Sequence, residues 1–205
     1  MQDIRLKSIR KASTEQPLRV LFSACMTGVV CAFDDSAYTD FASVRQLLSY
    51  PNLKAITFCP EHFSYGTPRA LCDIHGGTGI DVLEGRARVL TEEGEDWTEG
   101  MIKASEKMLE LAIREKVELA VLLDISASCG SQVIYGGARR KPGTPYLAGA
   151  GVCAAQLIRN GIPVISQRDF ASLQVVYSSL NPAFQADENA LDHHQTEWYR
   201  TYFKV

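Results

Sequence analysis

Long hydrophobic runs are missing from this sequence, in which no apolar stretch approaches the roughly 20 residues that span a bilayer. The basic start "IRLKSIRK" is not followed by the apolar region of a secretory signal. Excess charge is missing as well, because the formal net charge of −3 gives no overall attraction to a phosphate backbone. We therefore expect a cytoplasmic protein with no membrane partner, and nucleic acid is not favoured as a partner either.

Paired metal-ligand spacings are also absent. The six cysteines include no CxxC pair and the four histidines no HxxxH pair, although closed structural zinc sites usually show such spacings. A thiol–disulfide enzyme would place a CxxC at the start of a helix to lower a thiol pKa. No convincing GxGxxG follows the first apolar segment, so we expect neither a nicotinamide nor a flavin cofactor. Zinc-knuckle and thiol–disulfide functions are therefore disfavoured.

Alternating strand and helix patterns are what the chain does contain. Short apolar segments bounded by polar or turn residues predict buried parallel strands at residues 18–24, 53–59, 118–125 and 162–167. Helix patterns lie between them, at residues 41–50, 97–116 and 148–160. A chain of 205 residues is long enough for one sizeable domain. We predict an α/β fold, a single doubly wound, Rossmann-like domain with a mostly parallel sheet of about four strands.

Two extensions flank the predicted domain, which covers residues 18–167. Residues 1–17 are polar and end in a proline, which predicts a flexible N-terminal extension. Residues 168–205 are predicted to form a C-terminal extension that packs on the domain, with a polar, aromatic-rich tail that forms a helix or a strap. In this tail His193 and His194 have no acidic or thiol partner at a fixed spacing, so we expect them to be exposed. The sequence leaves the oligomeric state open.

Cysteines follow three of the predicted strands: Cys25 follows the first, Cys59 ends the second and Cys129 follows the third. Loops at the carboxyl ends of a doubly wound sheet gather into one crevice. A lone cysteine after a strand is often a small buried hydrophobe, but the convergence of three cysteines favours ligands. An iron–sulfur cluster accepts dispersed thiolates, and a [4Fe–4S] cube on three cysteines keeps one iron open as a Lewis acid.

Polar side chains accompany these cysteines. Glu61 lies two positions after Cys59, where a carboxylate in a partly dry cleft shuttles protons or, alternatively, stabilises the start of a helix. Ser126 and Ser128 lie just before Cys129, where serines commonly serve turns. The residues alone leave these alternatives open.

Four separated motifs resemble those of the DUF523 family, in the family's order. The family patterns are SACLLG-x-x-CRYDG, PVCPE with a downstream TPR, SPSCG with a following YDG, and G-x-GVTAALL. Here they correspond to "SACMTGVVCAFDD", "TFCPE" with "GTPR", "SASCGSQVIYGG" and "GAGVCAAQLIRNGIPVIS". The resemblance covers residues 18–167, and four motifs that match together are far more specific than any one of them.

One branch of the DUF523 family is similar to thiouracil desulfidase, which uses a [4Fe–4S] cluster held by three cysteines to remove sulfur from a thiolated pyrimidine. The resemblance implies an iron–sulfur-dependent desulfidase that hydrolyses a small, thiouracil-like thiolated heterocycle and releases sulfide. The cluster ligands that it implies are Cys25, Cys59 and Cys129, with Cys31 as the substitute.

Glu61 and Ser126 match the acid and a hydroxyl of the family motifs, which makes them the catalytic candidates. Glu61 would activate a water, and either side chain would supply a proton. The sequence departs from the family at the pocket wall, where "CAFDD" replaces CRYDG and Ala127 replaces the proline of SPSCG. These departures bear on the identity of the substrate more than on the chemistry.

Other roles stay open for the remaining residues. We expect Cys153 in the core, whereas Cys72 and His75 would form a second metal site only as the weaker alternative. If Cys31 or Cys72 supplied a fourth ligand, a non-catalytic iron–sulfur or metal-binding sulfur sensor or carrier would be the alternative function. A cluster-free protein with core or redox thiols is the third. The basic run at residues 138–143 is expected to be a solvated loop, or else to attract an anionic substrate.

Overall fold

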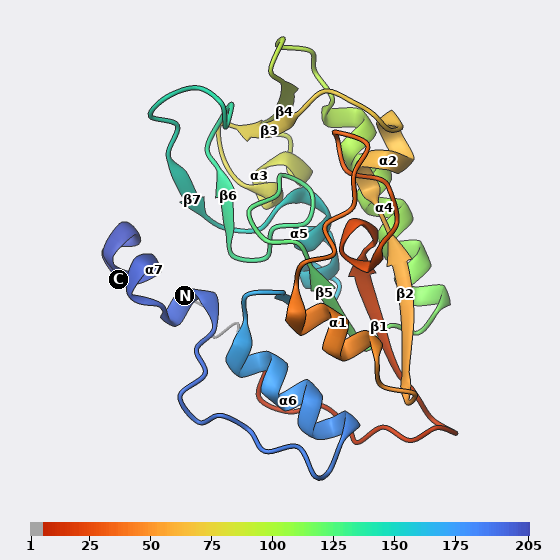
Figure 1. Cartoon of the computed structure of the whole chain (residues 1–205). Coiled ribbons are helices and arrows are strands. Elements are labelled where there is room, and N and C mark those ends of the chain that lie inside the picture. Colours follow the sequence, from red (N-terminus) through yellow and green to blue (C-terminus); the bar gives the residue numbers. More distant parts are fainter. Residues whose placement is uncertain (1–5) are drawn as a thin grey trace.

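A four-stranded parallel sheet forms the centre of the computed structural model, which describes residues 6–205 (Figure 1). The strand order is β2-β1-β5-β8, and every neighbouring pair is parallel. The chain passes from β1 to β2 on one side and then crosses to β5 on the other, so a topological switch point lies at the carboxyl ends of β1 and β5. The strands are β1 (Leu18–Ser23), β2 (Leu53–Phe58), β5 (Leu119–Leu122) and β8 (Val164–Ser166).

Helices cover both faces of the sheet, because its central strands carry apolar side chains on both sides. In β1, Val20 and Phe22 pack against one pair of helices, and Leu21 packs against the other pair. The predicted doubly wound α/β domain with four mostly parallel strands is confirmed. The helices of the first pair are α1 (Ala42–Leu48) and α6 (Phe170–Leu180), and those of the second are α4 (Thr98–Arg114) and α5 (Val152–Arg159).

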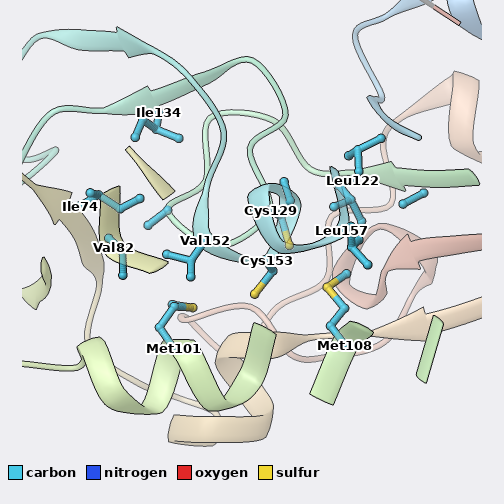
Figure 2. Close-up of a cluster of buried hydrophobic side chains, with 14 of the residues drawn as sticks. Ile74, Val82, Met101, Met108, Leu122, Cys129, Ile134, Val152, Cys153 and Leu157 are labelled. Carbon is cyan, nitrogen blue, oxygen red and sulfur yellow. The ribbon is translucent and has the colours of Figure 1, made fainter. Parts of the chain in front are cut away.

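The core between the sheet and the second pair of helices is shown in Figure 2. Met101 and Met108 of α4, Leu157 of α5 and Leu122 of β5 all belong to this core, and all four side chains are fully buried. The helical spacing in the sequence predicted that Met101 and Met108 share one face of α4, and their burial confirms it. This core anchors α5, whose start contacts the functional site.

Several short elements extend beyond the carboxyl ends of the central strands (Figure 1). The sequence patterns did not predict them, because elements of three to six residues are too short for a hydrophobic period to be recognised. They are the antiparallel pairs β3 (Cys72–His75) with β4 (Arg88–Thr91) and β6 (Val133–Tyr135) with β7 (Tyr146–Ala148), the helices α2 (Pro60–Tyr65) and α3 (Gly79–Leu83), and the 3-10 turn η1 (Ala24–Thr27).

The C-terminal extension continues from α6 into a tail that contains η2 (His193–Gln195) and α7 (Glu197–Phe203). The exposure predicted for His193 and His194 is wrong. His193 is only 6% exposed and bonds to Asp124, and the amide of His194 donates to the side chain of Gln132 at 3.2 Å. These partners are 69 and 62 residues away in the sequence, so no local spacing indicated them.

Residues 6–17 of the N-terminal extension lie along the domain. Leu6 is 9% exposed, and the amide of Ala12 donates to the carbonyl of Ser179 in α6 at 3.1 Å. Residues 1–5 of the predicted flexible extension lie outside the described residues, and the domain boundaries stay predictions. No helix within residues 6–205 combines the length and apolar character needed to cross a membrane.

Candidate functional site

A cavity of about 70 Å³ lies where β1, β2 and β5 end. It is lined by the loops that follow these strands, at the crevice that a doubly wound topology predicts. The structure therefore brings all the sequence-predicted site residues to one place. Those that line the cavity are Cys25, Cys31, Cys59, Cys129, Glu61, Ser126 and Ser128.

Cys25 and Cys31 flank a tight loop after β1. Cys25 lies in η1, which ends at Gly28 with a φ of 93°, a left-handed conformation that glycine adopts without strain. This turn sends the chain back, so that both thiols face the same cavity. The amide of Tyr38 donates to the carbonyl of Cys25 at 2.8 Å, which fixes the loop.

Cys59 lies at the start of α2, and Pro60 follows it as the first helical residue. Its sulfur accepts a hydrogen bond from the amide of His62 at 3.4 Å, so the thiol itself caps the helix. The Cys59 thiol also donates to the carbonyl of Cys31 at 3.6 Å. This contact joins the cysteine at the end of β2 to the loop after β1.

Cys129 is held by the start of α5. Its amide donates to the Ser126 hydroxyl at 3.2 Å, and the amide of Val152 donates to the carbonyl of Ala127 at 2.9 Å. A Cβ at Gly151 would lie 2.6 Å from the same carbonyl oxygen, so only glycine lets α5 begin this close to the cysteine loop. The close packing fixes the position of Cys129 relative to the sheet.

The pKa values of Cys31, Cys59 and Cys129 are raised, so these three thiols favour the protonated form when no cation is bound. Hydrogen bonding to Cys25 is the main cause that raises the pKa of Cys31 to about 11. Hydrogen bonding to Cys31 and then burial raise the pKa of Cys59, and burial raises the pKa of Cys129 to about 12. A metal ion reverses this preference, because a thiol that coordinates a metal is deprotonated. Four thiols without a disulfide among them are a donor set that fits an iron–sulfur cluster.

The spacing of the thiols does not suit a single metal ion. Sulfur ligands of one zinc ion lie about 2.3 Å from the metal and therefore close to one another. Within residues 6–205, only Asp169, Asp192 and His194 bring three such ligand atoms within 4.8 Å of one another. No three of the pocket thiols come that close together, which suits a larger inorganic group better than one ion.

Glu61 takes both positions that the sequence left open. It lies in the first turn of α2 and also lines the cavity, with a side chain that is 19% exposed. The Ser128 hydroxyl donates to Glu61 Oε1 at 2.6 Å, and the Ser126 hydroxyl lies 3.1 Å from that of Ser128. A continuous hydrogen-bonded path thus runs from the carboxylate to Ser126.

Arg69 is the residue of this site that sequence reasoning missed. Its side chain is 4% exposed, and its Nη2 donates to Glu61 Oε2 at 2.9 Å. Its Nη1 donates to the carbonyl of Cys31 at 2.9 Å, so one guanidinium joins the carboxylate to the cysteine loop. The signal was present in the motif "GTPR", which ends in this arginine. A buried arginine needs a carboxylate partner, and Glu61 of the neighbouring motif supplies it.

The basic run at residues 138–143 divides between two environments. The expectation of a solvated loop is wrong for Arg139, which lines the cavity and pairs with the buried Asp73 at 2.7 Å. Arg140 fits that expectation, because its side chain is 65% exposed and pairs with Glu92 at the surface.

Cys72 and Cys153 do not line the cavity. Cys153 is fully buried, as predicted for a core residue, and Figure 2 shows it with Cys129 among the apolar side chains of the core. Cys72 lies on β3, three residues before His75, and residues three apart on a strand face opposite sides. Neither residue belongs to the group of three close ligand atoms found within residues 6–205, so nothing in the described chain supports the alternative of a metal site on this pair.

Three comparisons relate the chain to known proteins. The family described as 2-thiouracil desulfurase matches residues 20–169, which include the four pocket thiols. The uncharacterized protein YbbK of Bacillus subtilis (strain 168) is 36% identical over 151 residues, which cover 73% of this chain and 96% of YbbK. The solved structure of the [4Fe-4S]-dependent thiouracil desulfidase TudS matches with a TM-score of 0.62 and 28% identity, over 78% of this chain and 98% of that one.

Proposed function

Because the chain belongs to the 2-thiouracil desulfurase family, which confirms the DUF523 resemblance, we propose that it is an iron–sulfur-dependent desulfidase. In this reaction a small thiolated heterocycle and one water give the oxo heterocycle and hydrogen sulfide, with cleavage of the C–S bond and no net redox change. The observation that carries the proposal is a hydrogen-bonded carboxylate, that of Glu61, in the same cavity as four thiols.

Cys25, Cys59 and Cys129 are the proposed ligands of a [4Fe–4S] cluster, with Cys31 as the substitute. They reach the cavity from the ends of three different strands. When bound, a cluster with one iron not held by a thiolate supplies a Lewis acid that withdraws electron density from the C–S bond. The carbon of that bond is then open to attack by water.

Glu61 is the proposed general base. Hydrogen bonds from Ser128 and Arg69 hold its two oxygens, so the carboxylate is oriented before substrate binds. It takes a proton from the attacking water as the C–O bond forms, and it returns a proton to the sulfur as the C–S bond breaks. Ser126 is the proposed second catalytic group, since its hydroxyl extends the proton path through Ser128.

The cavity walls suit a small planar ring as substrate. Phe33, Tyr38 and Phe58 line the cavity, and aromatic side chains pack well against heterocycles. A thiouracil-like compound is therefore the proposed partner, with no role for nucleic acid or a membrane. A cytoplasmic location is proposed with it, since a reducing compartment keeps the six cysteines free.

Iron and acid-labile sulfide content, measured with the visible spectrum on protein reconstituted without oxygen, tests the proposal. About four irons per chain and broad visible absorption are expected, followed by sulfide release from 2-thiouracil. No bound iron under these conditions would overturn the proposed function.

A non-catalytic sulfur sensor or carrier is the second candidate, and the position of Cys31 favours it. The thiol of Cys31 hydrogen-bonds with those of Cys25 and Cys59. Cys31 is therefore close enough to two of the proposed ligands to serve as a fourth ligand, which would close the cluster. Cys31→Ser separates the two functions. Retained iron with unchanged sulfide release supports the desulfidase, whereas sulfide release that appears only in the variant supports a closed, four-thiol cluster in the wild type.

A further inference from the structure

Buried polar side chains join the C-terminal tail to the functional site. His193 Nδ1 donates to Asp124 Oδ2 at 2.5 Å, and the two side chains are 7% and 0% exposed. Asp124 begins the segment of residues 124–132, the site loop, which carries Ser126, Ser128 and Cys129 into the cavity. The tail therefore contacts the base of the loop that presents these three groups.

Both ends of the site loop are tied at this base. Asp124 Oδ1 accepts from the amides of Ser131 and Gln132, at 3.3 and 3.5 Å, so one carboxylate closes the loop. At the far end, Gln132 Oε1 accepts from the amide of His194, and its Nε2 donates to Asp169 at 2.5 Å. The tail thus holds the first and the last residue of the loop.

The backbone of the site loop needs such support. Ile125, which follows Asp124, has a φ of 56°, in the left-handed region that β-branched residues disfavour. A strained residue of this kind persists only where its surroundings hold it. The hydrogen bonds of Asp124 act on the residue directly before the strained one.

Aromatic contacts in the tail fix the His193 ring in turn. The ring stacks on Trp198 with centroids 5.3 Å apart, and Tyr199 meets it edge-on at 5.9 Å. Tyr199 is itself 2% exposed, so α7 is anchored where it supports the histidine. The orientation that His193 needs to donate to Asp124 is therefore built into the tail.

The acidic residues beside this contact act as hydrogen-bond acceptors in the network and not as a metal site. Asp169 accepts from Gln132 and from the amides of Ser166 and His193. Asp192 accepts from the amide and the hydroxyl of Ser172, at 2.7 Å each. Each of the four carboxylate oxygens thus has a protein donor, which leaves the cluster satisfied without an ion.

We propose that His193 is a positioning residue that, through Asp124, holds the site loop so that Cys129 and the paired serines face the other thiols. The tail lies outside residues 20–169, so family membership does not supply this contact. A contribution to catalysis rests on the proposed function, whereas the positioning of the loop does not.

Thiol labelling of the cluster-free protein tests the proposal, with N-ethylmaleimide as the probe and peptide mass spectrometry to follow each cysteine. In His193→Ala, Cys129 should label at least about tenfold faster, a change of about 1.4 kcal/mol in local opening. Cys72, buried on β3, should keep its rate. His193→Asn returns a side-chain donor and should restore slow labelling. The control Tyr202→Phe removes a tail contact to the amide of Tyr146 and should leave Cys129 unchanged.

Two outcomes of the labelling would overturn the proposal: an unchanged rate for Cys129, or an equal acceleration of Cys72, which would mean general loosening. In the reconstituted enzyme, His193→Ala should lower kcat for sulfide release by more than it changes KM, with recovery in His193→Asn. The labelling needs no iron. A wild-type protein that neither binds iron nor releases sulfide would therefore contradict the proposed function and leave the positioning role intact. If the enzyme is active but His193→Ala does not change the labelling rate of Cys129, the positioning role is wrong and the proposed function stands.

Discussion

The two walls of the cavity are assembled in different ways. The first wall, formed by residues 23–69, relies on contacts between nearby segments, such as that of Arg69 with Glu61, eight positions apart. The second wall, the site loop, is held by α5 and by His193, which is 69 positions from its partner. The groups of the first wall can be recognised in short sequence windows. The geometry of the second wall depends on the completed fold.

Removing a ligand from the first wall should have the largest effect. Cys59→Ser replaces a soft thiolate with a hydroxyl, which is a poor ligand for an iron–sulfur cluster. We expect loss of visible absorption, of bound iron and of sulfide release from the anaerobically reconstituted protein. Cys72→Ala is the matched control and should retain all three. A Cys59→Ser protein that keeps its full iron content would show that the ligand set is wrong.

Glu61→Gln should separate chemistry from cluster binding within the same wall. The amide keeps the size of the side chain but cannot take a proton, so kcat should fall by roughly 10²–10⁴ while iron content is unchanged. Steady-state sulfide release and the visible spectrum measure the two properties on one sample. Glu99→Gln, at a side chain that is 84% exposed, should change neither. A colourless Glu61→Gln protein would contradict a purely catalytic role.

Arg69→Lys should give a smaller loss. Lysine keeps the charge but lacks the planar fork that bonds Glu61 and the carbonyl of Cys31 together. We expect kcat/KM to fall about tenfold, comparable to the loss of one charged hydrogen bond. Arg140→Lys, at the exposed end of the basic run, is the control and should match the wild type. Equal activity of the two variants would mean that Arg69 does not orient the carboxylate.

Gly151→Ala should affect activity least, and it probes the second wall. The added Cβ meets the carbonyl of Ala127 at 2.6 Å, so the start of α5 and the site loop must separate slightly. We expect a loss of roughly 1–3 kcal/mol in the free energy of unfolding, measured by urea titration, with a few-fold decrease in kcat. Gly85→Ala is the control, since it has open space but a φ of 75° and tests backbone strain alone. If Gly85→Ala lowers the free energy of unfolding more than Gly151→Ala does, and lowers kcat at least as much, close packing at Gly151 is not what holds the site loop.

The central sheet was predictable because its strands are short, mainly apolar segments bounded by polar or turn residues. Residues 119–122 of β5 are buried on both faces, and a short continuous apolar run is typical of such a strand in a parallel sheet. Once the strands were placed, the rule for their carboxyl ends brought Cys25, Cys59 and Cys129 to one cavity. The family motifs indicated Glu61 and Ser126 as further site residues. In the structure these two side chains are joined by hydrogen bonds through Ser128.

Contacts between distant polar residues were not predictable in the same way. His193 lies in polar sequence, where the usual expectation is exposure to solvent, whereas Asp124 lies within the predicted strand at residues 118–125, which does not indicate its partner. Their burial follows only from the path of the tail, which no periodic pattern reports. Arg69 is intermediate between these two cases. Its motif can be recognised in the sequence, but its pairing with Glu61 depends on how α2 places that carboxylate.

A ribosome makes this chain from its N-terminus, so all four pocket cysteines leave it before His193 does. Until the tail has been made and has folded back onto Asp124, the base of the site loop lacks its hydrogen bond from His193. The contact of His193 with Asp124 can therefore form only after the cysteine loops have been made. The order of translation thus places the contact that positions the site loop after the cysteines that it serves.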